Sequence, residues 1–211
     1  MVPMHSIDTT ETATERPVYD ATERTALLDI AARSITHGLA HQRPLDLDPH
    51  DYPEPLRAIR ATFVTLEHGE NLRGCIGVLE AFRPLVVDVA RNAFAAAFED
   101  PRFPPLRAAE YPELTLKLSV LTPAEPLAFD SEADLLAQIR PGVDGLILSD
   151  RRHRGTFLPS VWEQLPNPHD FLEHLKRKAG LPMGYWSDSL RVDRYRTESF
   201  GERISRLQQT V

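Results

Sequence analysis

The sequence has little of what several common chemistries require. Its single cysteine, Cys75, excludes an internal disulfide, a redox cysteine pair and a metal cluster built from cysteines. No uncharged apolar run approaches the ~18–20 residues that span a bilayer, and the first residues lack the pattern of a signal peptide. The chain also has no G-x-G-x-x-G, G-x-x-x-x-G-K-[ST], G-x-S-x-G or C-x-x-C motif. We therefore expect a cytoplasmic protein without a cofactor, a membrane span or the usual nucleotide-binding and hydrolase sites.

Positive charge is also in the minority. The chain has 24 Lys and Arg against 31 Asp and Glu, a net charge of −7, which gives no general attraction to nucleic acid or anionic membranes. Its basic clusters, 151–154 and 176–178, are expected at a hairpin tip and at a helix C-terminus, where solvated cations are common. Nucleic acid is thus a disfavoured partner, and an RNA-associated role through Arg151–Arg154 is the weaker alternative.

Hydrophobic periodicity divides the chain into helices and hairpins. We expect a disordered tail over 1–17, one domain over 18–205 and a C-terminal tail over 206–211. Helices are predicted over about 21–39, 84–99, 131–139 and 167–179, and strands over about 61–67, 72–79, 113–122, 146–148, 156–158 and 190–196. Because hairpins alternate with helices, the order favours an α+β fold: a mixed or mostly antiparallel sheet with helices packed on it.

The segment 72–77, with the sequence LRGCIG, is the most informative for chemistry. On a regular strand Arg73 and Cys75 share a face about 7 Å apart, and a nearby guanidinium favours the reactive thiolate form of a cysteine. Gly74 and Gly77 leave room for a ligand or another backbone to approach closely. The ordinary alternatives are a cysteine that packs as a small buried hydrophobic residue and glycines that mark a bulge.

A second candidate is the proline-rich loop 100–106, which follows a predicted helix. It contains a charge of each sign, Asp100 and Arg102, and the aromatic Phe103. The loop either presents one of these charges to a cleft or is a stiff connector whose shape an Asp100–Arg102 pair fixes.

Histidine spacing gives a weaker signal. His37 and His41 lie one helical turn apart, a spacing that can hold a metal ion, but the sequence offers no obvious third ligand. Histidine is also favourable at the C-terminus of a helix because of the helix dipole. We therefore predict no metal site.

Taken in order, these motifs resemble those of the AMMECR domain family. The matching segments are 72–77, Asp100–Leu106, Ser119–Pro123, Gly142 with Gly145, Phe157–Val161, Phe171–Leu181, and Glu198 with Phe200. The resemblance spans about residues 22–205. It implies two unequal, interlocked lobes with a groove near the 72–77 strand. In prokaryotes it also implies association with a Memo-like protein and a radical-SAM protein in the AmmeMemoRadiSam system, but it implies no particular reaction.

Two functional hypotheses follow, and both leave the oligomeric state open. In the first, the protein is a cofactor-free, ligand- or partner-binding component of a modification system. Its groove would be lined by Arg73, Gly74, Cys75, Gly77, Asp100, Arg102, Phe103 and Lys178. In the second, the protein is an enzyme. Cys75 is then the nucleophile, Arg73 stabilises its thiolate or an anionic substrate, and a histidine, of which His68 is nearest in sequence, transfers the proton.

Overall fold

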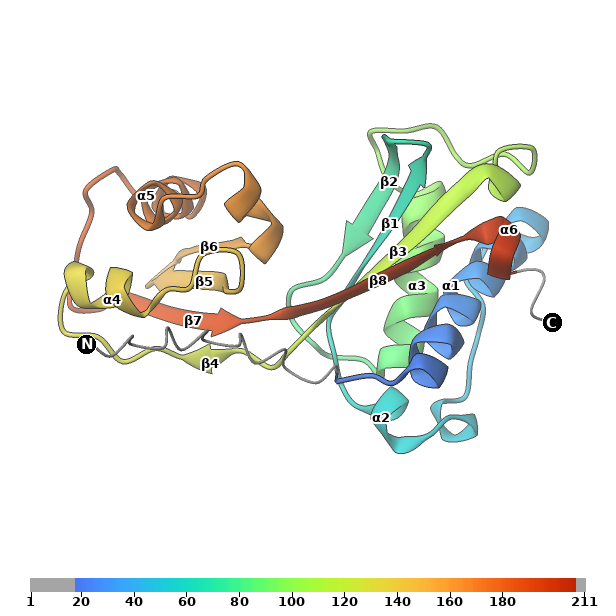
Figure 1. The fold of residues 1–211 in the computed structure, drawn as a ribbon, viewed down its shortest axis with the longest axis horizontal. Coiled ribbons are helices and arrows are strands. Elements are labelled where there is room, and N and C mark those ends of the chain that lie inside the picture. The colour runs from blue at the N-terminus through green and yellow to red at the C-terminus, as the bar shows by residue number, and fades with distance from the viewer. Residues whose placement is uncertain (1–17, 208–211) are drawn as a thin grey trace, which may run out of the picture.

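The computed structural model describes residues 18–207 and contains two unequal lobes side by side (Figure 1). The predicted tail 1–17 and residues 208–211 lie outside the described residues. The larger lobe contains α1 (Ala21–His41), α2 (Glu54–Arg57), β1 (Thr62–His68), β2 (Asn71–Gly77), α3 (Leu85–Phe98), β3 (Leu114–Leu121), β8 (Thr197–Arg203) and α6 (Ile204–Leu207). The smaller lobe contains β4 (Glu125–Pro126), α4 (Glu132–Gln138), β5 (Gly145–Asp150), β6 (His153–Phe157), α5 (Pro168–Lys178) and β7 (Arg191–Tyr195).

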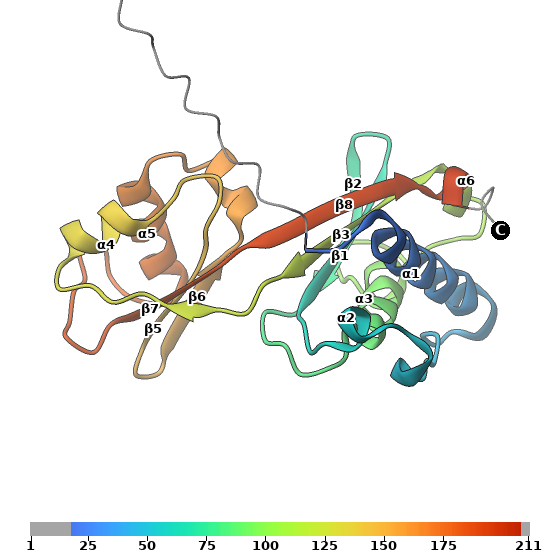
Figure 2. The same cartoon turned by 60° about the horizontal axis from the view of Figure 1, so that its bottom comes forward.

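Each lobe is built on a four-stranded antiparallel sheet. The strand order is β2-β1-β3-β8 in the larger lobe and β4-β7-β5-β6 in the smaller one. Figure 2 shows α1 and α3 together on one face of the first sheet, and their buried residues form one core with those of β1 and β3. The predicted α+β fold is confirmed, although its strands are divided between two sheets.

Local sequence signals explain where the helices begin and end. Asp20 and Glu23 form a capping box at the start of α1. The Asn167 side chain caps α5 at its start, and Gly180, at φ +82°, follows its last turn in a left-handed conformation that glycine adopts without strain. Within residues 18–207, no helix is long and apolar enough to cross a membrane.

The C-terminal part of the chain differs from the prediction. The strand predicted over 190–196 is β7, and β8 follows after a single residue and returns the chain to the first sheet. Its sequence, TESFGER, is mostly polar and none of its residues is buried, because β8 is an edge strand, so it lacks the apolar alternation by which strands are recognised. The short helix α6 then buries Ile204 in the larger core.

A small apolar cluster joins the two lobes. Ala61 and Leu121 from the larger lobe pack there with Ile147 and Tyr195 from the smaller one. The Tyr195 hydroxyl donates a hydrogen bond to the Phe157 carbonyl oxygen at 3.1 Å, and burial raises the pKa of Tyr195 to about 12. The chain crosses between the lobes directly after two members of this cluster, Leu121 and Tyr195.

Candidate functional site

A β-bulge in β2 changes the geometry expected for Arg73. Leu66 pairs with Gly74, whereas the next residue, Glu67, pairs with Leu72, so Arg73 is the extra residue of the bulge. The strict alternation that would place Arg73 and Cys75 side by side therefore does not hold here. Sequence periodicity does not reveal a bulge, because register depends on the partner strand.

The Arg73 side chain is engaged by the loop between α3 and β3. Its Nε donates to Glu110 Oε1 at 2.8 Å and its Nη2 donates to the Pro104 carbonyl oxygen at 3.0 Å. The guanidinium also lies 5.9 Å from the centre of the Phe103 ring. Hydrogen bonding from Arg73 lowers the pKa of Glu110 to about 2. Arg73 and Phe103 thus hold this loop against the edge of β2.

The guanidinium beside Cys75 belongs to Arg102. Arg102 Nη2 donates to the Cys75 carbonyl oxygen at 3.1 Å and to Asp100 Oδ2 at 2.7 Å. The pKa of Arg102 is raised, chiefly by its hydrogen bond to Asp100 and also by the charge and side chain of Cys75. The positive charge beside Cys75 therefore comes from Arg102 of the 100–106 loop and not from Arg73.

Asp100 links the two motifs. Its buried carboxylate accepts the Cys75 backbone N–H at 2.9 Å, the Arg102 backbone N–H at 3.1 Å and Arg102 Nε at 2.9 Å. The Arg102 hydrogen bonds, followed by that from the Cys75 backbone, hold the pKa of Asp100 well below its ordinary range. We call Cys75, Asp100 and Arg102 the β2 clamp. The Asp100–Arg102 pair considered from sequence is present in it, and it fixes both the loop and the strand edge.

The Cys75 thiol is half-buried and not sealed in the core. It lies opposite Thr65, whose hydroxyl donates to its sulfur at 3.3 Å. His68, the histidine considered as proton carrier, lies three residues farther along β1, a separation of about 10 Å along a strand. Its Nε2 lies 2.6 Å from Glu113 Oε2 at the far end of the hairpin. The structure brings Arg102 to the thiol but not His68.

Gly74 and Gly77 of β2 each allow a neighbouring group to pack closely against the strand, but the neighbouring group differs. A Cβ on Gly74 would lie 2.1 Å from the Ala96 carbonyl oxygen of α3, so this glycine lets the helix lie directly on the strand. A Cβ on Gly77 would lie 2.4 Å from the Phe63 ring. Gly77 shares its face of the sheet with Cys75, because their partners Phe63 and Thr65 are two residues apart on β1.

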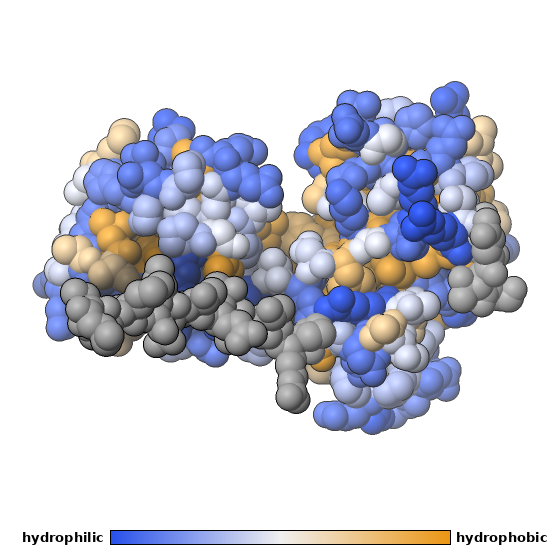
Figure 3. All heavy atoms as spheres, in the orientation of Figure 1, coloured by the Kyte–Doolittle hydropathy of each residue, from blue (hydrophilic) through white to orange (hydrophobic). Residues whose placement is uncertain are grey.

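A cavity of about 300 Å³ lies where this face meets the smaller lobe. We call it the interlobe groove. It is lined by Phe63, Gly77, Leu79, Thr156, Leu158, Val161 and Lys178. Figure 3 shows the surface hollowed between the lobes, with hydrophobic residues in the depression. The Lys178 ammonium lies 5.0 Å from the centre of the Phe157 ring. Gly77 and Lys178, both predicted site residues, thus lie on opposite walls of one groove.

The other basic cluster closes one side of the lobe junction. Arg154 of β6 forms an ion pair with Glu80, which follows β2, while Arg151 forms the β5–β6 turn with a φ of +54°. These contacts give Arg154 a structural role in joining the lobes.

Two groups of potential metal ligands lie elsewhere. His37 and His41 have ring centres 4.4 Å apart on α1, and the pKa of His37 is lowered by burial and by the neighbouring His41 and Arg43.

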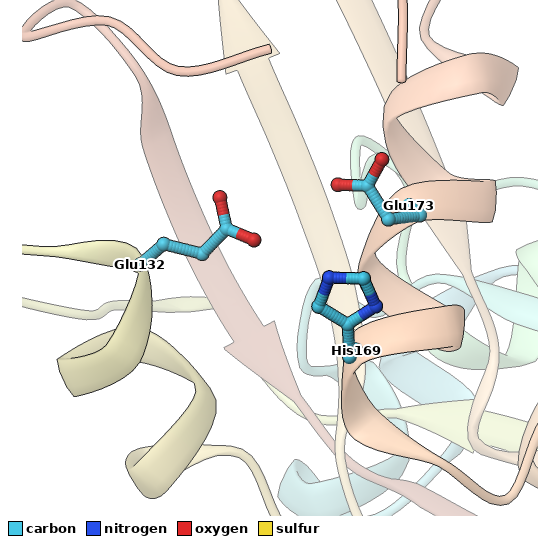
Figure 4. A group of neighbouring side chains, drawn as sticks. All are labelled: Glu132, His169 and Glu173. Atoms are coloured by element: carbon cyan, nitrogen blue, oxygen red, sulfur yellow. The ribbon is translucent and has the colours of Figure 1, made fainter. Parts of the chain in front are cut away.

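The second group, Glu132, His169 and Glu173, comes from α4 and α5 (Figure 4). The fully buried ammonium of Lys176 lies 3.0 Å from Glu132 and 2.6 Å from Glu173. This lysine already supplies the positive charge that the two carboxylates require. No sequence pattern pointed to the group, because Glu132 is about 40 residues from the other two.

Comparison with known proteins gives a consistent result. The AMMECR1 family model matches residues 28–200. A protein of Methanothermobacter thermautotrophicus is 41% identical over 182 residues, covering 85% of this chain and 94% of its own length. Protein MJ0810 of Methanocaldococcus jannaschii is 35% identical, covering 72% of this chain and 77% of its own length. The crystal structure of the uncharacterized protein PH0010 from Pyrococcus horikoshii superposes with a TM-score of 0.74 at 33% identity, covering 86% of this chain and 92% of that one.

Proposed function

This chain belongs to the AMMECR1 family, and we propose that it is a ligand- or partner-binding component of a modification system. The observation that carries the proposal is the interlobe groove, because it brings Gly77 and Lys178 together beside the face that contains Cys75. Ligand sites are typically concave and mostly apolar, with a few polar groups that fix orientation. Here the polar groups are the Thr156 hydroxyl and the Lys178 ammonium.

The β2 clamp supports binding more than catalysis. The Asp100 carboxylate accepts hydrogen bonds from both Cys75 and Arg102, and Arg102 donates one to the Cys75 carbonyl oxygen. This arrangement makes the strand edge rigid, and a rigid wall lowers the entropy lost when a partner binds. A nucleophilic cysteine also needs a base within hydrogen-bond reach, whereas His68 is engaged by Glu113.

We propose a Memo-like protein and a radical-SAM protein as the partners, on the basis of the family resemblance. An apolar groove with a lysine at one wall suits a protein segment that presents an apolar side chain and a carboxylate. Such a segment would bury its apolar part against Phe63, Leu79 and Leu158 and pair its charge with Lys178.

Charge reversal at one groove residue tests this proposal. Titration of a Memo-like protein from the same organism against Lys178→Glu is expected to show at least a tenfold weaker affinity, about 1.4 kcal/mol. The matched control is Arg177→Glu, since Arg177 is exposed on the same helix but does not line the groove. We expect the control to bind within about threefold of the wild type. Equal losses in the two variants, or no binding to the wild type, would refute the proposal.

The enzyme hypothesis is separated from the binding hypothesis by Cys75→Ser. If Cys75 is only part of a binding surface, Cys75→Ser is expected to keep the wild-type affinity for the partner. The reason is that the β2 clamp uses the backbone of residue 75 and not its side chain. If the complex instead supports turnover that Cys75→Ser abolishes while binding is unchanged, the nucleophile hypothesis is correct.

A further inference from the structure

The outer edge of β2 has backbone groups that point away from its sheet. β2 is an edge strand on the side of the sheet toward the smaller lobe (Figure 1), so every second residue directs its N–H and C=O away from β1. The Val78 N–H donates to the Thr62 carbonyl oxygen at 3.0 Å, which makes these two residues a hydrogen-bonded pair. The adjacent pair, Phe63 with Gly77, is then a non-hydrogen-bonded one. The backbone groups of Gly77 therefore point outward, as do those of Cys75 two residues earlier.

At Cys75 the outward groups are already used. The Asp100 carboxylate accepts the Cys75 N–H at 2.9 Å, and Arg102 Nη2 donates to the Cys75 carbonyl oxygen at 3.1 Å. A neighbouring antiparallel strand would offer the same residue one acceptor and one donor. The β2 clamp therefore takes the place of a strand at Cys75, and another chain cannot pair with β2 there.

At Gly77 the corresponding groups are open. Among residues 18–207, no group forms a hydrogen bond with the Gly77 N–H or with its carbonyl oxygen. Gly77 is half-buried and lines the interlobe groove, so both groups lie at the wall of a cavity. An unpaired donor and acceptor on a strand edge form a template for an extended chain segment. The groove thus offers a place for strand addition that is one residue wide.

The β2 clamp restricts which part of a chain can pair at Gly77. Every strand pair of this sheet is antiparallel, and an antiparallel segment added to β2 would run from Gly77 toward Cys75. The clamp blocks it there, so a chain that ends at Gly77 fits and a chain that continues does not. One oxygen of its terminal carboxylate would accept the Gly77 N–H, as the Asp100 carboxylate accepts that of Cys75.

The charge of the groove agrees with a chain end of this kind. Its lining residues include Lys178 and no acidic residue, so a terminal carboxylate would meet a complementary charge. The apolar lining suits the side chains that precede the carboxylate. We propose that the interlobe groove binds the carboxyl-terminal segment of a partner protein as a strand added to β2 at Gly77. This inference rests on the proposed function and specifies how the partner is recognised.

Extension of the partner chain tests this mode of binding. The full chain is titrated with the Memo-like protein from the same organism, carrying four additional Gly and Ser residues at its C-terminus. We expect at least tenfold weaker affinity than for the unmodified Memo-like protein, because the added residues would have to pass the β2 clamp. The matched control carries the same four residues at its N-terminus, and its affinity should stay within about twofold of the unmodified protein.

Amide hydrogen exchange measures the backbone contact itself. In the isotope-labelled full chain saturated with the unmodified Memo-like protein, the exchange of the Gly77 N–H is expected to slow at least tenfold. Gly69 is the internal control, because it is an exposed glycine in the turn of the same hairpin and does not line the groove. Its exchange rate should be unchanged.

The outcomes distinguish this inference from the proposed function. If the Memo-like protein binds and Lys178→Glu weakens it, the proposed function stands. Equal affinities of the two extended proteins, or an unchanged exchange rate at Gly77, would then overturn strand addition alone. If the Memo-like protein does not bind the wild type, the proposed function fails and this inference fails with it.

Discussion

Replacing Asp100 with alanine is expected to lower the free energy of unfolding by about 3 kcal/mol. The main loss is at the backbone, because the N–H of the half-buried Cys75 keeps no acceptor, and an unsatisfied buried donor costs about 1–3 kcal/mol. The lost ion pair adds less, since the Arg102 side chain is 53% exposed and its charge can be hydrated. Urea unfolding followed by circular dichroism measures the change.

A second variant of this residue separates the charge of Asp100 from its role as a hydrogen-bond acceptor. Asp100→Asn keeps an oxygen that can accept the Cys75 N–H, so its loss should be about half that of the alanine variant. The matched control is Asp130→Ala, which removes an exposed carboxylate from the smaller lobe and should change stability by less than about 0.5 kcal/mol. Equal stability of Asp100→Ala and the wild type would contradict the structural role of the β2 clamp.

The low pKa of Asp100 predicts a pH dependence of known sign. Its pKa in the folded protein lies below the value near 3.9 that it has in an unfolded chain. In acid the unfolded state therefore binds the proton more readily, and the stability from Asp100 is lost as the pH falls below about 4. It is fully present above about pH 5. Asp100→Asn should accordingly show a shallower loss of stability than the wild type between about pH 4.5 and 2.

Gly74→Val is expected to destabilise the protein by about 3–4 kcal/mol. Valine favours strands by intrinsic propensity, so propensity alone predicts the opposite sign. The Cβ would lie 2.1 Å from the Ala96 carbonyl oxygen in the last turn of α3, and a backbone atom cannot move aside as a flexible side chain can. Helix and strand must separate, which also opens the core between them.

The control for this variant lies two residues away. Leu72→Val places the same side chain on the same strand, but Leu72 is 42% exposed. The free energy of unfolding of this variant should therefore stay within about 0.5 kcal/mol of the wild type. Thermal unfolding of both variants gives the comparison. A Gly74→Val protein as stable as the wild type would show that α3 does not rest on β2 at this glycine.

The features predicted correctly from the sequence depend on neighbouring residues. The capping box of α1 involves Asp20 and Glu23, which are three residues apart, and α5 is bounded by Asn167 and Gly180 within one segment. The alternation of leucines along β3 likewise reflects burial of one face of a single strand. Such signals are complete within a short window of sequence, so each element is found without its tertiary partners.

The site could be predicted only in part, because its geometry depends on contacts between distant segments. The residues of the 72–77 and 100–106 motifs do meet, but the bulge directs Arg73 to Glu110 and leaves Arg102 beside Cys75. A bulge changes pairing without changing composition, so periodicity does not detect it.

Alkylation of Cys75 tests the central claim most directly, namely that a partner binds in the interlobe groove. Because Cys75 is the only cysteine in the chain, its rate of reaction with iodoacetamide reports on the face of β2 that leads into the groove at Gly77. Saturation with the Memo-like protein is expected to slow that reaction at least tenfold in the wild type. Lys178→Glu should need correspondingly more partner for the same protection. A Memo-like protein that binds while the alkylation rate is unchanged would show that the partner binds elsewhere and would contradict the account.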